Sequence, residues 1–229
     1  MIHFLLLAAS SIGVAETSDL APFTRIEHRG SIDLQVFVDP SASPKVVLKG
    51  DEERIEEIEI ESSGGVLTIR TKSNSGWSWW SGKKGQVRGT ITLPKLEALA
   101  TVGSGDVDVK GLDGADFELR STGSGDVTLR GRIGDLDVKT SGSGDFEARD
   151  LASSRVRIRA PGSGDVELAG TADLVKIDLM GSGDVDAGDL VVQERLDVSI
   201  MGSGDVTICA RGEVDKSTMG SGDVRIRCD

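Results

Sequence analysis

The chain has 229 residues, of which 30 are glycine and 8 are aromatic (3 Trp and 5 Phe), and its formal net charge at pH 7 is −12. A nucleic-acid binder needs a basic face against the phosphates, so this charge excludes nucleic acid as a partner. A transmembrane helix needs about 20 consecutive apolar residues, and the candidate run lies within residues 1–15. The glycine excess, without a collagen triplet, directs the search to internal repeats.

The amino terminus has the pattern of a secretory signal peptide. Residues 1–15 read MIHFLLLAASSIGVA, with an apolar run followed by Gly13 and Ala15 at positions −3 and −1 of a cut before Glu16. A short apolar end that packs on the domain is the alternative. We expect the mature chain, residues 16–229, to be exported to the periplasm, the extracellular space or the cell surface, without a transmembrane segment.

Residues 16–100 are β-rich but irregular. Apolar residues alternate at 32–38, 58–61, 66–71 and 86–93, and residues 51–57 (DEERIEE) form the one plausible helical turn. The repeats that follow indicate a solenoid. We interpret residues 16–100 as the amino-terminal coils of that solenoid, or as a small β layer that caps its first coil, rather than as a separate domain.

The tetrapeptide Gly-Ser-Gly-Asp organises residues 101–229. It occurs seven times, at intervals of 20, 19, 20, 19, 21 and 18 residues. A period near 20 residues indicates a solenoid, in which each repeat buries its apolar face only against its neighbours. The copies occupy residues 103–106, 123–126, 142–145, 162–165, 181–184, 202–205 and 220–223.

Alternating apolar residues flank every copy. Val107 and Val109 follow the first Asp, and Phe117 and Leu119 precede the second copy. Period two predicts short strands with one buried face, so each coil is strand, variable turn, strand and Gly-Ser-Gly-Asp turn. Equivalent strands would pair in parallel at about 4.8 Å. Because parallel crossovers are nearly always right-handed, the predicted fold is an all-β, right-handed parallel β-helix with ~20-residue coils.

The carboxy-terminal coil departs from the pattern. Lys216 stands where an inward apolar residue is due, as expected of a solenoid end, which needs polar capping. Cys209 and Cys228 are 19 residues apart, about one coil, so they are spaced for a disulfide in an oxidising compartment. Two independent thiols are the alternative.

The ordered series of these segments resembles the head GIN domain of the auto-transporter adhesin family of bacterial secreted proteins. The resemblance covers about residues 22–229 and rests on FTRIEHRGSIDLQVFV, GDEERIEEIEIES, GGVLTIRTK, GTITLPKLEAL and the repeated GSGD. It implies a β-helical fold at the cell envelope and an adhesion role. It implies no catalytic residues.

The Gly-Ser-Gly-Asp turn has a structural explanation. Glycine permits a tight turn, and the Ser and Asp side chains can accept hydrogen bonds from nearby backbone N–H groups. A column of carboxylates about 4.8 Å apart would repel by roughly 1 kcal/mol per pair in water, so hydrogen bonds or bound cations must offset the repulsion. We favour a structural turn and expect no cofactor; the alternative is calcium bound by the motif aspartates. These are Asp106, Asp126, Asp145, Asp165, Asp184, Asp205 and Asp223.

Two further groups of side chains are candidates for binding. Trp77, Trp79 and Trp80 lie in SGWSWWS, and they either contact a ligand or surface or cap the apolar end of the solenoid. Met180, Met201 and Met219 each precede a motif and should stack in a column. Soft packing is the favoured interpretation of that column, and Cu(I) binding is the alternative.

We therefore predict a non-enzymatic, exported binding or surface-interaction module, adhesin-like, whose partner is a cell-surface glycan or an envelope protein. A structural envelope protein without a specific ligand is the main alternative. A polysaccharide-active enzyme is a further one, since carboxylates about 5 or 10 Å apart approach glycosidase separations. Seven equivalent turns do not supply the unlike environments that a catalytic acid and base need, so no catalytic residue is predicted.

Overall fold

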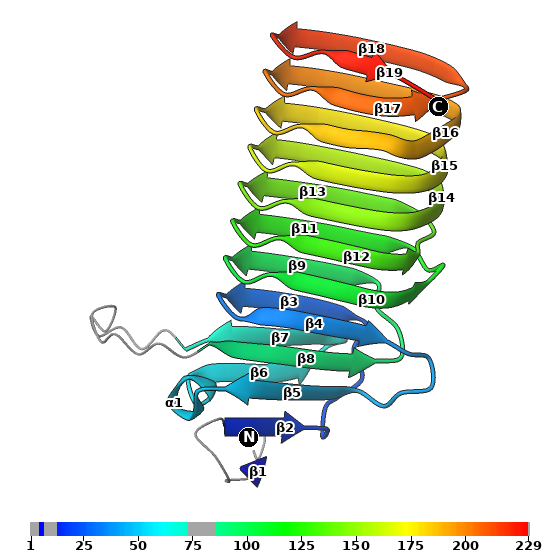
Figure 1. Cartoon of the computed structure of the whole chain (residues 1–229). Coiled ribbons are helices and arrows are strands. Elements are labelled where there is room, and N and C mark those ends of the chain that lie inside the picture. The colour runs from blue at the N-terminus through cyan, green and yellow to red at the C-terminus, as the bar shows by residue number, and fades with distance from the viewer. Residues whose placement is uncertain (1–4, 7–12, 73–85, 229) are drawn as a thin grey trace.

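The structure, a computed structural model, describes residues 5–6, 13–72 and 86–228. Its strands stack one above another into a β-solenoid (Figure 1), and all of them belong to one hydrogen-bonded sheet system. The one helix among the described residues is the single turn α1 (Glu52–Ile55), within the predicted range. The described residues contain no helix with the length and apolar character of a membrane span.

Residues 98–226 form the regular coils. The register of their parallel pairs joins the motif glycines one coil apart, for example Gly103 to Gly123 and Gly123 to Gly142. The predicted parallel β-helix is therefore confirmed. Its strands are β9 (Ala98–Gly103), β10 (Val107–Asp113), β11 (Phe117–Gly123), β12 (Val127–Arg132), β13 (Leu136–Gly142), β14 (Phe146–Gly162), β15 (Val166–Gly181), β16 (Val185–Gly202), β17 (Val206–Ala210), β18 (Glu213–Gly220) and β19 (Val224–Ile226).

The core is a stack of aliphatic rows inside the coils. Leu119, Val138, Ile158 and Ile177 occupy equivalent positions, and each is 0% exposed. Burying a side chain of this kind contributes about 1.5–3 kcal/mol relative to leaving it exposed. The alternation that predicted the strands is therefore also the pattern that fills the core.

The motif glycines are required by the close approach of successive turns. Gly123 has φ +129°, and a Cβ there would lie 2.0 Å from the carbonyl oxygen of Gly103. A Cβ on Gly125, the second glycine of that copy, would lie 2.3 Å from the carbonyl oxygen of Gly105. The turns thus stack backbone on backbone, which leaves no space for a side chain at either position.

The amino-terminal part continues the solenoid in an order that differs from the chain order. Strands β3 (Arg25–Gly30) and β4 (Asp33–Val38) pair in parallel with β9 and β10 on one side. On their other side they pair in parallel with β7 (Val66–Thr71) and β8 (Val87–Leu93). The coil of residues 25–38 therefore lies between two coils that come later in the sequence (Figure 1).

An antiparallel layer closes this end of the stack. Strand β5 (Lys45–Gly50) pairs with β8, and β6 (Ile58–Ser63) pairs with β7, both antiparallel. Strand β2 (Gly13–Thr17) adds to β5, and β1 (Leu5–Leu6) adds to β2. In this part of the chain two coils therefore continue the solenoid, and a β layer lies against them.

The cut expected before Glu16 falls inside β2. Ala15 is 1% exposed and Thr17 is 4% exposed, so both side chains belong to the interior of the cap. Glu16 itself faces outward and pairs with Lys45 at 2.9 Å. Residues 13–15 therefore pack on the domain, as in the alternative to a signal peptide. Export of the chain stays a prediction.

The carboxy-terminal end has a polar cap and a covalent tie. Lys216 occupies the position next to Val198, and its Nζ donates to the carbonyl oxygen of Val224 at 3.4 Å. Cys209 and Cys228 form the predicted disulfide, with 4.6 Å between their Cα atoms. The last coil is therefore tied to the one below it at the point where the backbone ladder ends.

Removing the first three residues of β2 should weaken the amino-terminal cap. A chain that begins at Glu16 lacks Gly13, Val14 and the buried Ala15, together with their hydrogen bonds to β5. We expect its free energy of unfolding to be about 2 kcal/mol lower than that of a chain that begins at Gly13. Urea unfolding of the two chains measures the difference, and equal midpoints would show that these residues do not stabilise the cap.

Candidate functional site

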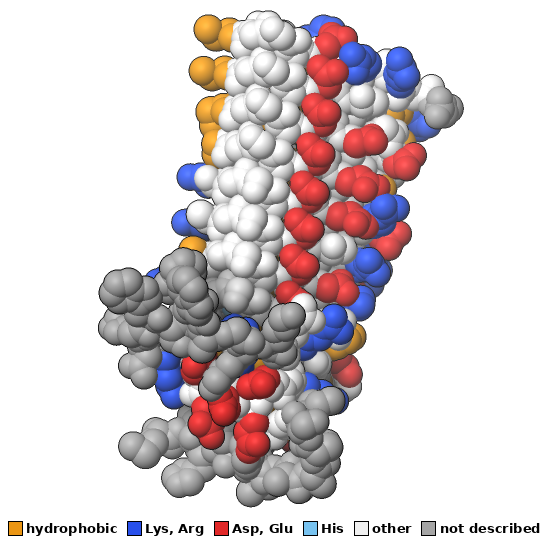
Figure 2. Space-filling view, turned by 60° about the vertical axis from the view of Figure 1, so that its left-hand side comes forward, with side chains coloured by type: hydrophobic (Ala, Val, Ile, Leu, Met, Phe, Trp, Pro, Cys, Tyr) orange, Lys and Arg blue, Asp and Glu red, His pale blue; other side chains and the backbone are white. Residues whose placement is uncertain are grey.

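The Gly-Ser-Gly-Asp turns stack along one edge of the solenoid. Figure 2 shows this edge as an uncharged ridge with a straight column of acidic side chains beside it. The ridge consists of backbone and of exposed motif serines such as Ser124 and Ser163. The backbone N–H of Ser124 donates to the carbonyl oxygen of Gly103 at 3.0 Å, so the turns are hydrogen-bonded as well as stacked.

Each motif carboxylate below the last coil accepts a hydrogen bond from the next coil, whereas Asp223, in the last coil, accepts one from the backbone N–H of Val224 at 2.9 Å. The Oδ1 of Asp145 accepts from the backbone N–H of Asp165 at 2.8 Å, and the Oδ1 of Asp165 accepts from that of Asp184 at 2.8 Å. The same bond recurs along the column, with donor–acceptor distances of 2.8 to 3.3 Å. Backbone amides therefore supply the attraction that offsets the repulsion between carboxylates.

The column contains one further aspartate, which lies outside the seven copies of the motif. Asp33 accepts from the backbone N–H of Asp106 at 3.3 Å, and Gly30 pairs with Gly103. Residues 30–33 read GSID, which is a copy of the motif with Ile32 in place of the second glycine. Allowing one mismatch would have found it. We call Asp33 and the seven motif aspartates the aspartate ladder.

Near the carboxy-terminal end of the ladder, two contacts stabilise the negative charge of Asp205. The backbone N–H of Asp223 and then the guanidinium of Arg225 lower the pKa of Asp205. Arg225 donates to Asp205 Oδ2 at 2.8 Å. Both contacts favour the ionised carboxylate.

The seven motif aspartates, without Asp33, are the calcium candidates of the sequence. They lie in line, one coil apart, and their Oδ1 atoms already accept backbone hydrogen bonds. Within the described part of the chain, no group of three or more His, Cys, Asp or Glu side chains is placed to hold one metal ion. Calcium binding by these residues therefore rests on the sequence alone.

A groove lies at the opposite edge, where the variable turns begin. Its volume is about 790 Å³. It forms beside residues 114–116 and 133–135, which interrupt the strands, whereas β14, β15 and β16 run through this turn unbroken. Its lining includes Lys95, Glu97, Asp116, Asp135, Asp137, Arg155 and Arg157.

Three pairs of oppositely charged side chains lie within the groove. Arg155 contacts Asp135 at 3.1 Å, and Arg157 contacts Asp137 at 3.3 Å. Lys95 contacts Glu97 at 2.6 Å and, with a hydrogen bond from Thr24, lowers the pKa of that carboxyl. The groove thus presents fixed donors and acceptors to solvent. Sequence reasoning missed it, because no motif marks residues that converge from four different coils.

His28 is a buried imidazole inside the coil of β3. Its side chain is 1% exposed, and neither Nδ1 nor Nε2 has a hydrogen-bond partner. Burial lowers the pKa of His28 to about 4, against a smaller opposing effect of Asp33. The imidazole is therefore neutral at pH 7.

The remaining predicted residues divide into two cases. Trp77, Trp79 and Trp80 lie outside the described residues. Met180, Met201 and Met219 do form a column in adjacent coils, but they are 42%, 51% and 69% exposed. The predicted stacking is therefore confirmed, and the column lies on the outer surface beside the turns rather than in the core.

Comparison with protein families gives one match that spans most of the chain. The family model described as "Putative auto-transporter adhesin, head GIN domain" matches residues 22–149 and 130–229. Among curated proteins, none matches the chain.

Solved structures of three bacterial proteins share the fold. A "putative adhesin" from Parabacteroides distasonis has a TM-score of 0.79 and 19% identity, and the alignment covers 94% of this chain and 97% of that one. A "putative adhesin" from Parabacteroides merdae has a TM-score of 0.77 and 17% identity, with 95% and 97% covered. A "putative lipid binding protein" from P. distasonis has a TM-score of 0.75 and 22% identity, with the same coverage.

Asp165 provides a test of the aspartate ladder. In Asp165→Ala the backbone N–H of Asp184 loses its acceptor, and we expect a loss of about 1–2 kcal/mol in the free energy of unfolding. Asp165→Asn keeps an acceptor oxygen and removes one charge, so it should lose less. Urea unfolding compares the two with Ser163→Ala, an exposed control in the same turn. Equal losses in Ala and Asn variants would show that the charge, rather than the hydrogen bond, matters.

His28 predicts a specific acid sensitivity. Because its folded pKa lies below its usual value of 6.5, the unfolded chain binds the proton more readily, and stability falls as the pH drops below about 6.5. Between pH 7 and pH 5 we expect the free energy of unfolding to fall by about 2 kcal/mol in the wild type and by much less in His28→Leu.

The pH dependence of urea unfolding measures this effect. The other histidine of the sequence is His3, so His3→Gln is the matched control and should keep the wild-type dependence. The same decline in His28→Leu would assign it to other groups.

Proposed function

Because the chain belongs to the family of the auto-transporter adhesin head GIN domain, we propose that it is an exported, non-enzymatic surface-interaction protein. The family and two of the structures with the same fold carry the name adhesin, which makes the chain an adhesin-like β-solenoid. Adhesion to a cell-surface glycan or an envelope protein, and location outside the cytoplasm, are the finer parts of the proposal.

The observation that carries this proposal is the rigid array of outward-facing groups on the solenoid. Hydrogen bonds between turns and strands fix every coil to its neighbours, so outward side chains repeat at the strand spacing of about 4.8 Å. Such a scaffold fixes the backbone that carries the contact groups, so binding costs less conformational entropy. The disulfide between Cys209 and Cys228 agrees with an oxidising compartment.

The electrostatics favour binding over catalysis. A general acid needs a raised pKa, whereas hydrogen bonds lower the pKa of both Asp205 and Glu97. The ladder carboxylates have nearly equivalent surroundings, so they do not divide into an acid and a base. These points support a non-enzymatic protein.

The groove is the contact site that we propose on the described surface. Its carboxylate and guanidinium groups are planar, fixed by their ion pairs and exposed, and such groups hydrogen-bond pairs of hydroxyls. A glycan is therefore the ligand class that the groove suits best. Trp77, Trp79 and Trp80 are a second proposed contact, which rests on the sequence.

A glycan array probed with the fluorescently labelled chain tests the proposal. We expect specific glycans to be retained by the wild type, and Arg157→Ala to lose at least about tenfold in affinity, since it removes a fixed donor from the groove. This variant should still fold, because Asp137 keeps its contact with Arg159 at 3.4 Å.

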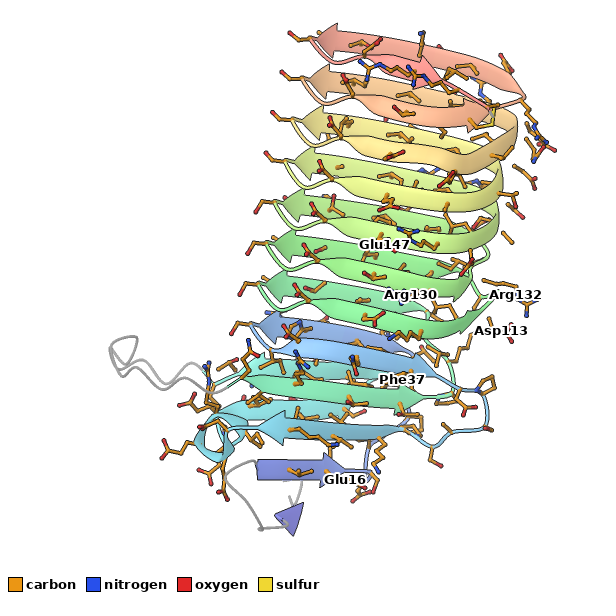
Figure 3. The ribbon with its side chains drawn as sticks, in the orientation of Figure 1. Glu16, Phe37, Asp113, Arg130, Arg132 and Glu147 are labelled. Atoms are coloured by element: carbon orange, nitrogen blue, oxygen red, sulfur yellow. A yellow bond between two sulfur atoms is a disulfide. The ribbon has the colours of Figure 1, made fainter. Side chains whose placement is uncertain are left out.

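Two controls sharpen the result. Arg132 pairs with Asp113 at the variable-turn edge (Figure 3) and does not line the groove, so Arg132→Ala makes the same change of charge elsewhere. The double variant Trp79→Ala, Trp80→Ala tests the tryptophans separately. Equal loss in both arginine variants would reject the groove. Binding of no glycan and no envelope protein would support a structural role without a specific ligand.

A further inference from the structure

Three methionines lie one above another on the outer surface of the last coils. Met180 pairs with Met201, and Met201 pairs with Met219, in the parallel register of β15, β16 and β18. Figure 2 shows exposed hydrophobic side chains in a column along the upper left edge, next to the uncharged ridge. Met180 and Met201 face outward, because the residues before them, Leu179 and Ile200, are 1% exposed and fill the core, and Met219 is itself 69% exposed.

The methionine column is not explained by packing or by protein docking. On one side it borders the exposed motif serines, and on the other it borders Asp178, Ser199 and Ser217, which also face outward. The apolar stripe is therefore one residue wide. It continues through Pro161 and ends at the polar Ser141. A docking patch of several hundred Å² does not fit this outline.

The chemistry that the three side chains share is the thioether sulfur. Thioethers are soft ligands that select Cu(I), and Ag(I) has the same preference. Coils are about 4.8 Å apart, so Met201 has a thioether neighbour on each side. Methionine is unbranched, with three rotatable bonds, and its exposed side chain can therefore turn its sulfur toward a shared ion.

Among residues 13–72 and 86–228, no other soft donor is placed beside this column. The sequence has two cysteines, and both are in the disulfide. His28 is buried several coils away. We propose that Met180, Met201 and Met219 form a binding site for a soft monovalent metal ion, Cu(I) or Ag(I), with three thioether ligands. This site is independent of the proposed surface interaction.

Titration of the full chain tests the site. Cu(I), kept reduced with ascorbate, is added in competition with a chromophoric Cu(I) chelator, and Ag(I) serves as a probe without redox chemistry. Methionine methyl groups labelled with carbon-13 report the ligands by NMR. We expect one ion per chain, and we expect the methyl signals of the three methionines to shift together.

Met201→Leu is the decisive variant. It removes the central sulfur and keeps a similar apolar volume at an exposed position, so the melting temperature should not change. We expect binding to weaken by at least about tenfold. Val102→Leu changes an exposed residue of the same column in an earlier coil, and it should bind as the wild type does.

Two results would overturn the site. Wild-type affinity in Met201→Leu would place the ion elsewhere, at Met1 or His3 for example. Absence of stoichiometric binding to the wild type, for both Cu(I) and Ag(I), would show that the column does not bind soft metals. Equal loss in Met201→Leu and Val102→Leu would assign the effect to the surface rather than to the sulfur atoms.

Discussion

The contact on which the rest of the molecule depends is the stacking of one turn's backbone on the next. A side chain at either motif glycine would place its Cβ within 1.8–2.3 Å of the turn below, a distance at which no atom fits. With glycine there, the turns stack as closely as the strands do, and the coils keep one spacing all round. That spacing brings each aspartate Oδ1 within reach of the next backbone N–H. The same close stacking also sets equivalent outward side chains in register.

Because the backbones of the motif turns stack closely, the two edges of the solenoid have different roles. At the motif edge the backbone leaves no freedom, so the turn repeats with little change from coil to coil. At the variable-turn edge residues 114–116 and 133–135 interrupt the strands, and the groove lies beside them. Hydrogen bonds between successive turns recur along the first edge. Differences in shape and charge, which specific binding needs, are concentrated at the second.

Much of the fold could be predicted from the sequence, because a strict period determines which residues stack. The repeat of Gly-Ser-Gly-Asp gave the parallel strands, their inward residues and the pairing of Cys209 with Cys228. Ile32 hid one copy of the motif, so the part played by Asp33 was missed. The position of the coil of residues 25–38 could not be predicted either, since periodicity shows what can stack but not which neighbour is chosen.

Less of the candidate site was predictable. The groove depends on side chains brought together from separate coils, and no local pattern marks them. The burial of His28 follows from its inward position beside Ile69 and Thr101, which alternation alone would have suggested had the coil been placed. The methionine column was predicted but its exposure was not, although the alternation would have shown it: Ile177 and Leu179 face inward, which places Met180 on the outer face.

The place of β3 and β4 in the stack has a consequence for how the chain folds. From residue 98 onward each coil pairs with a partner about one period away, so these contacts form locally and fast. The contact of Asp33 with Asp106 spans 73 residues, and it closes only after β9 and β10 exist. Closing so long a loop costs entropy before any contact rewards it. Assembly should therefore begin in the regular coils, and the first residues of the domain to be synthesised should be among the last to find their places.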